Sequence, residues 1–243
     1  MKKFVDLHLC LPIGKLETVD SMIRVARKLG YAIVGVSLPP NVTSAQIGLL
    51  REVCRNYGVD MATRVDLAPG SPMELLRLLR HVRRRFEIVS VVCSSKSVAR
   101  QAAKDRRVDV LSFRAVDSRQ RFFDRSEAEL ASKALAVFEI DMRLLLSSSG
   151  FLRMRILSML RREVAIALSY DVPVIVSSGA SDEFLLRSPR DFAALAMLFD
   201  MSMPYALKAL SENPLGIVGR NREKLEPSFV APGIRVVRRG KDC

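Results

Sequence analysis

The sequence predicts a single α/β domain over residues 1–243, folded as an irregular TIM-like βα barrel with about seven mainly parallel strands. Short apolar runs alternate with segments of helical period, and no linker rich in Pro, Gly or Ser divides the chain. This alternation is typical of a parallel sheet covered by helices. A length of 243 residues suits one barrel, and a hydrophobic content of 49% is enough to build a large core.

Seven runs have the apolar, β-branched character of strands that are buried on both faces. They span residues 4–9, 32–38, 59–67, 87–93, 108–113, 135–142 and 172–178. The first strand-to-helix connection, LPIGKLETVD, lacks the GxGxxG pattern of a dinucleotide-binding open sheet. A closed barrel is therefore favoured over an open doubly wound sheet.

Two of the intervening segments show a clear helical period. In residues 71–86 the predicted buried face is Leu75, Leu79, Val82 and Phe86, opposite Arg77, Arg80 and Arg84. In residues 153–170 it is Ile156, Leu160, Val164, Ala167 and Leu168. Ser71 followed by Pro72 is a typical N-cap with proline at the first helical position.

After residue 178 the pattern is mainly helical, with helices expected over 188–199, 204–210 and 214–224. Only FVAPGIRVV, residues 229–237, remains for an eighth strand, and its Pro-Gly makes it a poor central strand. We therefore expect extra helices near the C-terminus in place of a regular eighth unit.

The charge is strongly positive, with a formal net charge of +13 and 29 arginines against 10 lysines among the 39 basic residues. The planar guanidinium matches phosphate and stacks on bases, so this excess favours a nucleic-acid partner. Adaptation to heat or to a particular cytoplasm is the alternative source of a high charge content.

The cysteines and the N-terminus indicate a cytoplasmic protein without membrane association. Cys10, Cys54, Cys93 and Cys243 are far apart and form no CxxC pair, which argues against a zinc ribbon or a disulfide framework. No apolar stretch approaches the ~18 residues of a membrane span. Charged and polar residues also begin too early for a signal peptide.

The opening VDLHLC places Asp6, His8 and Cys10 on one face of the first strand. The spacing resembles the Asp-x-His-x-His that opens the metal site of the polymerase-and-histidinol-phosphatase (PHP) phosphoesterases, but Cys10 replaces the second histidine. The only other histidine, His81, falls in a predicted basic helix. Carboxylates expected at strand ends are Asp6, Asp66, Glu139, Asp141 and Asp182. They could hold a hard cation, or equally pair with arginines and cap helices.

A multi-metal hydrolytic centre is not expected from this set of side chains. The sequence also has no nucleophile elbow, phosphate loop or HExxH motif. We therefore predict no catalytic residue and no metal site in this chain.

Basic residues gather in residues 77–86, 96–107 and 113–125, and the tail 235–241 adds more. In the third segment arginines alternate with Phe113, Phe122 and Phe123, which suits stacking on unpaired bases. The alternatives are a solvated helix face and aromatic side chains that pin a loop to the barrel. The predicted RNA contacts are Arg77, Arg80, Arg84, Lys96, Arg107, Arg114, Arg119, Arg121, Arg187 and Arg220.

Residues 172–199 and 206–224 are similar to the C-terminal signature of the ribonuclease P protein component 3 family. The similarity rests on Ser-Ser-Gly-Ala at 177–180, Arg-Ser-Pro at 187–189, Asn-Pro at 213–214 and Arg-Asn at 220–221. The opening FVDLHLCLP also fits the first strand of that family, so the likeness extends over nearly the whole chain.

This resemblance implies a TIM-like barrel that serves as a subunit of the endoribonuclease that removes the 5′ leader of precursor tRNA. It implies a catalytic RNA that uses Mg²⁺, and a chain that binds no cofactor of its own. The implied partners are ribonuclease P RNA, precursor tRNA, other ribonuclease P proteins and protein component 2, the last in a heterodimer or heterotetramer. Ser177, Ser178 and Gly179 could contact a phosphate at a helix start, or merely cap that helix.

Two other functions stay open at this point. A PHP-like metal-dependent phosphoesterase would bind transition metal, and the shortage of histidines argues against it. A barrel enzyme for an anionic metabolite would gather its basic residues in one pocket, whereas the arginines of this chain are dispersed.

Overall fold

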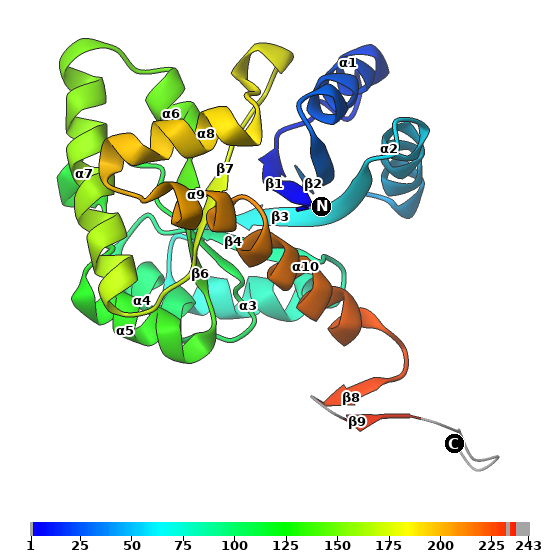
Figure 1. The fold of residues 1–243 in the computed structure, drawn as a ribbon. Helices are drawn as coiled ribbons and strands as arrows, with labels where there is room; N and C mark the ends of the chain where they lie inside the picture. The colour runs from blue at the N-terminus through cyan, green and yellow to red at the C-terminus, as the bar shows by residue number, and fades with distance from the viewer. Residues whose placement is uncertain (1, 232–233, 237–243) are drawn as a thin grey trace.

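Seven parallel strands form one sheet whose order follows the chain from β1 to β7, as expected for a barrel. The computed structural model describes residues 2–231 and 234–236 (Figure 1). The strands are β1 (Phe4–Leu9), β2 (Tyr31–Ser37), β3 (Asp60–Leu67), β4 (Ile88–Val92), β5 (Val110–Ser112), β6 (Val137–Asp141) and β7 (Val174–Ser177). Each strand overlaps one of the predicted runs. The predicted irregular TIM-like barrel is therefore confirmed.

The barrel closes between β1 and β7 through few backbone contacts. A parallel bridge pairs Leu9 with Ala180, and the amide of Cys10 donates to the Ala180 carbonyl at 2.8 Å. Farther down β1, the amide of Val5 donates at 2.9 Å to the carbonyl of Leu210, which follows α9 (Met203–Ala209). A backbone carbonyl at the end of α9 thus accepts a hydrogen bond from the edge of β1 that an eighth strand would otherwise cover.

Helices cover the outside of the barrel and begin at capping residues. Ser71 is the N-cap of α3 (Pro72–Val82), where its hydroxyl accepts from the Glu74 amide at 3.2 Å. The other outer helices are α1 (Leu16–Lys28), α2 (Ser44–Asn56), α4 (Lys96–Lys104), α5 (Arg125–Ala134), α7 (Gly150–Ser169) and α8 (Pro189–Ala196). Shorter elements are α6 (Met142–Leu146) and the 3₁₀ turns η1 (Ser118–Gln120), η2 (Glu183–Leu185) and η3 (Met197–Phe199).

The predicted buried face of α7 is correct except at one position. Ile156, Leu160, Val164 and Ala167 are buried, whereas Leu168 is 42% exposed. Leu168 follows Ala167 directly, so it is turned by about 100° away from the face that packs on the barrel.

α10 (Glu212–Leu225) closes the amino-terminal end of the barrel. Its Ile217 and Val218 pack in one cluster with strand residues Val5, Leu7, Ile33, Ala62, Ile88, Val110, Val137 and Ile175. The side-chain amide of Asn213 donates to the Val174 carbonyl at 2.7 Å, and that of Asn221 to the Glu87 carbonyl at 2.8 Å. The Asn-Pro and Arg-Asn motifs of the sequence therefore hold this helix against the strand ends.

Two short strands near the C-terminus pair with each other outside the barrel. β8 (Phe229–Ala231) and β9 (Ile234–Arg235) pair antiparallel and project away from the barrel beyond α10 (Figure 1). This segment does not join the barrel sheet, as its Pro-Gly predicted. Most of the basic tail, residues 237–241, lies outside the described residues, as does the end of the predicted domain.

None of the described helices has the length and apolar character needed to cross a membrane.

Candidate functional site

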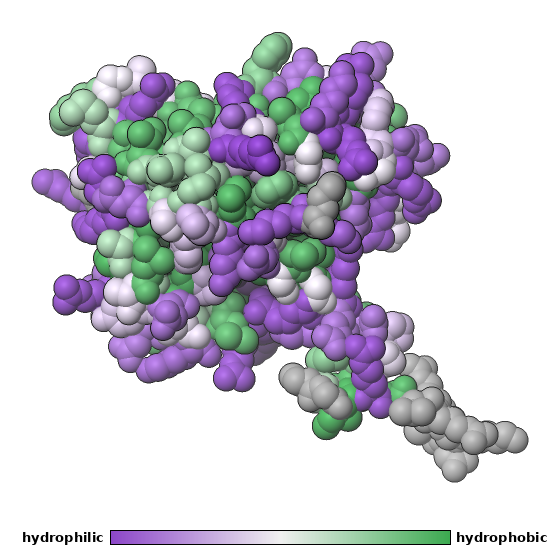
Figure 2. All heavy atoms as spheres, in the orientation of Figure 1, coloured by the Kyte–Doolittle hydropathy of each residue, from purple (hydrophilic) through white to green (hydrophobic). Residues whose placement is uncertain are grey.

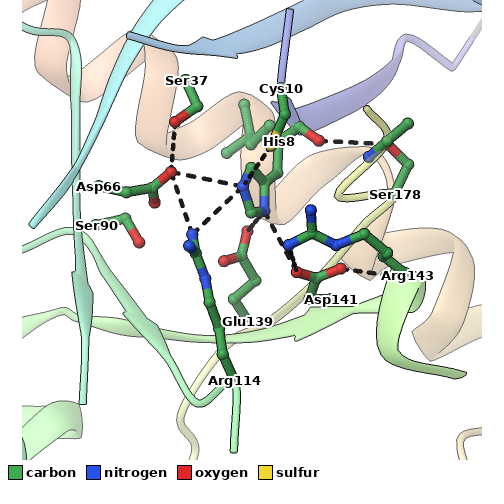
Figure 3. A network of polar contacts seen from close by, with 12 residues as sticks. His8, Cys10, Ser37, Asp66, Ser90, Arg114, Glu139, Asp141, Arg143 and Ser178 are labelled. Carbon is green, nitrogen blue, oxygen red and sulfur yellow. Dashed lines mark hydrogen bonds and ion pairs between the residues drawn. The ribbon is translucent and has the colours of Figure 1, made fainter. Parts of the chain in front are cut away.

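The carboxyl ends of the strands bring together several polar residues that the sequence singled out and one, Arg64, that it did not. We call this group the barrel mouth: Asp6 and His8 from β1, Arg64 and Asp66 from β3, and Glu139 and Asp141 from β6. Most of it is shown in Figure 3, with Cys10, Arg114 and Arg143 around it. All six side chains are at least largely buried. Four of the five carboxylates that the sequence placed at strand ends therefore lie in this group, whereas Asp182 instead caps η2 through the Phe184 amide.

Arg64 is fully buried and links strands across the barrel. Its guanidinium donates to both carboxylate oxygens of Glu139, at 2.5 and 2.7 Å. It also donates to Asp66 at 2.8 and 3.0 Å. Burial alone would lower the pKa of Arg64, but the two carboxylates raise it above its ordinary value. Arg64 is therefore a permanent cation at the centre of the barrel mouth.

The carboxylates beside Arg64 remain ionised. Burial alone would raise the pKa of Glu139, but the charge of Arg64 outweighs burial and lowers that pKa to about 2. The pKa of Asp66 is likewise below its ordinary value, because the charges of Arg64 and Arg114 and the Ser37 hydrogen bond outweigh burial. The half-exposed Arg114 lies 3.2 Å from Asp66 and covers the site from the solvent side.

His8 is the one histidine of the barrel mouth and it is uncharged. Its pKa is lowered to about 4, first by burial and then by repulsion from Arg64. Its ring nitrogens lie 3.5 Å from Asp66, 3.8 Å from Glu139 and 3.9 Å from Asp141. At neutral pH this imidazole therefore adds no positive charge to the network.

The barrel mouth does not fit the metal centre of a PHP phosphoesterase. The oxygens of Asp66 and Glu139 that would bind a cation are within hydrogen-bond distance of the Arg64 guanidinium. Cys10 occupies the position of the second histidine, and its Sγ lies 3.5 Å from His8 Nε2. Among the described residues, no three or more His, Cys, Asp or Glu side chains are grouped so that they could hold a metal ion. We therefore derive no metal-dependent step at this site.

Asp6 joins β1 to the end of β7 at the seam of the barrel. Its Oδ1 accepts from the amides of His8 and Ser178, each at 3.1 Å, while Oδ2 is buried and has no hydrogen-bond partner among the described residues. Burial raises its pKa to about 6, against a weaker lowering by the Ser178 and His8 hydrogen bonds. The folded chain thus disfavours the charged form of Asp6.

This raised pKa predicts how the Asp6→Asn variant responds to pH. Between about pH 4 and pH 6 the folded chain keeps a proton that the unfolded chain has released, so ionisation of Asp6 destabilises the fold as pH rises. Measured by urea unfolding, the stability of Asp6→Asn relative to the unsubstituted chain should increase by about 2 kcal/mol between pH 4 and pH 7. A stability difference that is independent of pH would contradict this assignment.

The predicted phosphate contact at Ser177, Ser178 and Gly179 is wrong for this structure, because all three residues are buried. The Ser178 hydroxyl donates to the His8 carbonyl at 3.3 Å and accepts from the Ala180 amide at 3.1 Å. Gly179 has φ +62°, and a Cβ there would overlap the Asp141 carboxylate. These residues close the barrel seam, which explains why the turn requires glycine.

The predicted RNA contacts differ in their exposure. Six are exposed: Arg77, Arg80, Arg84, Lys96, Arg119 and Arg187. Three are half-buried and held by carboxylates: Arg107 by Asp105, Arg114 by Asp66 and Arg220 by Asp109. Contact of these nine residues with RNA stays a prediction. Figure 2 shows hydrophilic residues over much of one face of the molecule.

The prediction that Arg121 contacts RNA is wrong, because this residue is buried. Its guanidinium donates to Glu163 at 2.8 and 2.5 Å and to the Phe113 carbonyl at 2.5 Å. Phe123 also stacks on Phe138 inside the protein, with ring centroids 4.4 Å apart. The loop at 113–125 is thus pinned to the barrel, which was the alternative that the sequence left open.

Sequence reasoning missed two charged residues, one at the barrel mouth and one at the opposite end of the barrel. Arg64 is a charged residue inside an apolar strand, which is a detectable signal, but its partner Glu139 is 75 positions away. Lys224 lies one helical turn after Arg220 on α10, a spacing that places both on the same side of that helix.

Comparison with known proteins agrees with the resemblance found in the sequence. The model of the family described as RNase P subunit p30 matches residues 3–226. Ribonuclease P protein component 3 of Methanococcoides burtonii is 30% identical over 97% of this chain and 94% of its own length. The protein of the same name from Methanosarcina barkeri is 31% identical over 98% of this chain and 97% of its own length.

Solved structures show the same fold. A chain in the cryo-EM structure of archaeal ribonuclease P with mature tRNA has a TM-score of 0.85, at 20% identity, with 98% of this chain and 99% of that chain covered. An amidohydrolase has a TM-score of 0.58 at 12% identity, with 97% of this chain and 78% of that chain covered. The family model and the relatives of at least 30% identity both extend over nearly the whole chain, so this chain belongs to the RNase P subunit p30 family, the protein subunits of a complex that processes the 5′ ends of tRNA.

Proposed function

We propose that this chain binds ribonuclease P RNA and precursor tRNA and supports the catalytic RNA as it removes the 5′ leader. One observation supports this function above the others: the barrel mouth, where related barrels would place their chemistry, is filled by the ion pairs of Arg64. The chain instead offers a net charge of +13.

The physical basis of this support is charge neutralisation. RNA phosphates repel one another as a catalytic core compacts, and arginines on a protein surface replace the counterions that would otherwise screen them. Exposed residues such as Arg77, Arg80 and Arg84 are placed to do this. In this proposal Mg²⁺ bound by the RNA supplies the chemistry, and this chain supplies no reacting group.

The proposed protein partners are component 2, in a heterodimer or heterotetramer, and other ribonuclease P proteins. Phe151 and Met154 on α7 are 73% and 65% exposed and lie three positions apart, so they share one helix face. Large apolar side chains on one exposed face are typical of a protein interface.

We also propose that this chain acts in the cytoplasm.

The test is precursor-tRNA cleavage by the catalytic RNA at limiting Mg²⁺, with component 2 present and this chain added or omitted. We expect this chain to restore cleavage at a Mg²⁺ concentration at which the RNA and component 2 alone are nearly inactive. A small unrelated protein of the same net charge is the control for non-specific screening. Equal stimulation by that control, or no stimulation at all, would contradict the proposed function.

A further inference from the structure

A cluster of cations surrounds Asp109 at the amino-terminal end of the barrel, opposite the barrel mouth. Arg83 follows α3 and donates to Asp109 Oδ2 at 2.5 Å, while Arg220 on α10 donates to Oδ1 at 3.3 Å. Asp109 itself is buried. One carboxylate is thus shared by two guanidinium groups, which leaves an excess of positive charge.

Nearby charges increase this excess. Arg84, Arg106 and Lys224 also line this region, and among the described residues none of the three forms an ion pair. The neighbouring acids Glu223 and Glu226 both accept from Arg235, at 2.6 and 3.1 Å.

Two further observations show that the positive charge is incompletely balanced. Arg83 Nη2 and Arg220 Nε are buried without a hydrogen-bond acceptor among the described residues. The pKa of Lys224 is below its ordinary value, first because of burial and then because of repulsion from Arg220, with Arg83 and Arg106 adding to it. An anion at this place would pair with the free donors and offset the repulsion at Lys224.

The cluster opens into two cavities that share Lys224 and Phe229. One, of about 500 Å³, has Arg83 and Arg84 in its wall. The other, of about 520 Å³, is lined by Arg106 and Arg220 and also by the apolar side chains of Leu135 and Phe229. Cationic and apolar surfaces therefore lie next to each other, as the backbone and the base of a nucleotide require.

Leu135 is unusual at its position. It ends α5 with φ +65°, a backbone conformation that favours glycine or asparagine, and its side chain is 59% exposed. A left-handed backbone and exposure to solvent are both unfavourable for leucine, and contact with a binding partner would explain why leucine occupies this position.

We propose that this cluster binds a single-stranded segment of RNA, with backbone phosphates at Arg84, Arg106 and Lys224 and an unpaired base against Leu135 and Phe229. The inference rests on the proposed function, because it names one place, at the amino-terminal end of the barrel, where the chain would contact the RNA that it supports. A single strand is favoured over a duplex because a base must enter the apolar cavity, and bases in a duplex are stacked.

The test uses the full chain and a fluorescent oligoribonucleotide of about ten nucleotides, with affinity measured by anisotropy over a range of salt concentrations. The variant Arg84→Gln/Arg106→Gln/Lys224→Gln should bind about tenfold more weakly. The slope of log affinity against log salt concentration should become shallower by about 2, because each phosphate contact with a single strand contributes about 0.7 to that slope. The matched control Arg24→Gln/Arg27→Gln/Lys28→Gln removes three exposed charges from α1 and should change affinity by less than about threefold.

The base contact is tested separately with Leu135→Asn, because asparagine suits the left-handed backbone and should not weaken the fold. We expect about fivefold weaker binding of the single strand, an unchanged salt slope and unchanged binding of duplex RNA. Equal losses from the two triple variants, or no effect of Leu135→Asn, would overturn the assignment of this site.

Cleavage assays at limiting Mg²⁺ then separate the two proposals. If the unsubstituted chain and the site variants stimulate cleavage equally, the proposed function stands and the site is wrong. If the unsubstituted chain gives no stimulation, the proposed function itself fails, whatever the binding data show.

Discussion

Replacing Arg64 with methionine is expected to lower the free energy of unfolding by about 3–5 kcal/mol. The substitution leaves the fully buried Glu139 and the largely buried Asp66 without the cation that keeps their pKa values below the ordinary range. It also removes the hydrogen bonds that join β3 to β6 and to the Leu7 carbonyl of β1. The large effect follows from an uncompensated buried charge rather than from the net strength of the ion pair.

Urea unfolding at neutral pH measures this effect, and a double-mutant cycle tests its origin. Glu139→Gln removes the stranded charge, so Arg64→Met/Glu139→Gln should be less destabilised than the sum of the single variants, by at least about 1 kcal/mol. Arg24→Met, at an exposed position on α1, is the matched control and should change stability by less than about 0.5 kcal/mol. Additive single effects would show that Arg64 and Glu139 do not act as a pair.

Gly35→Ala is expected to cost about 3 kcal/mol, the second large effect. A Cβ at Gly35 on β2 would lie 2.5 Å from the carbonyl oxygen of Leu7 on the neighbouring strand β1. Because the obstacle is backbone, the two strands must move apart, which disturbs the pairing of Val5 with Ile33 and Asp6 with Val34.

Gly48→Ala on α2 is the control for this substitution, because a Cβ there meets no atom within 4 Å. It lies inside a helix, so alanine should stabilise the chain by about 0.5–1 kcal/mol. Thermal or urea unfolding should therefore give opposite signs for the same chemical change. A loss of stability in both variants, or in neither, would contradict the close approach of β1 and β2.

The positions of the strands could be predicted from the sequence, because their apolar runs are short, buried on both faces and separated by helices with a clear period. It also located the carboxylates of the barrel mouth, since parallel strands end on the same side of a sheet. The partner of Arg64 was not predictable, because a contact across the barrel depends on which strands face each other. Residue spacing within one strand holds no such information.

The surface was predicted less well than the core for a similar reason. Arg121 belongs to a basic segment that resembles the other basic segments of the chain, yet its side chain is buried because it forms an ion pair with the buried Glu163 of α7. The same holds for Ser177 to Gly179, which are needed at the seam because the part of the chain that the structure describes adds no eighth strand to the sheet. Both errors arose where a tertiary contact, rather than local pattern, decides exposure.

The central claim is that the chain supports the catalytic RNA through its charge and not through chemistry at the barrel mouth. The most direct measurement compares the unsubstituted chain with His8→Asn in precursor-tRNA cleavage at limiting Mg²⁺, after near-ultraviolet circular dichroism has confirmed that both are folded. His8 is the only histidine at the barrel mouth, so this substitution removes the one imidazole that metal binding or acid–base chemistry there could use. Equal stimulation per folded molecule is the expected result, and loss of stimulation by folded His8→Asn would contradict the account.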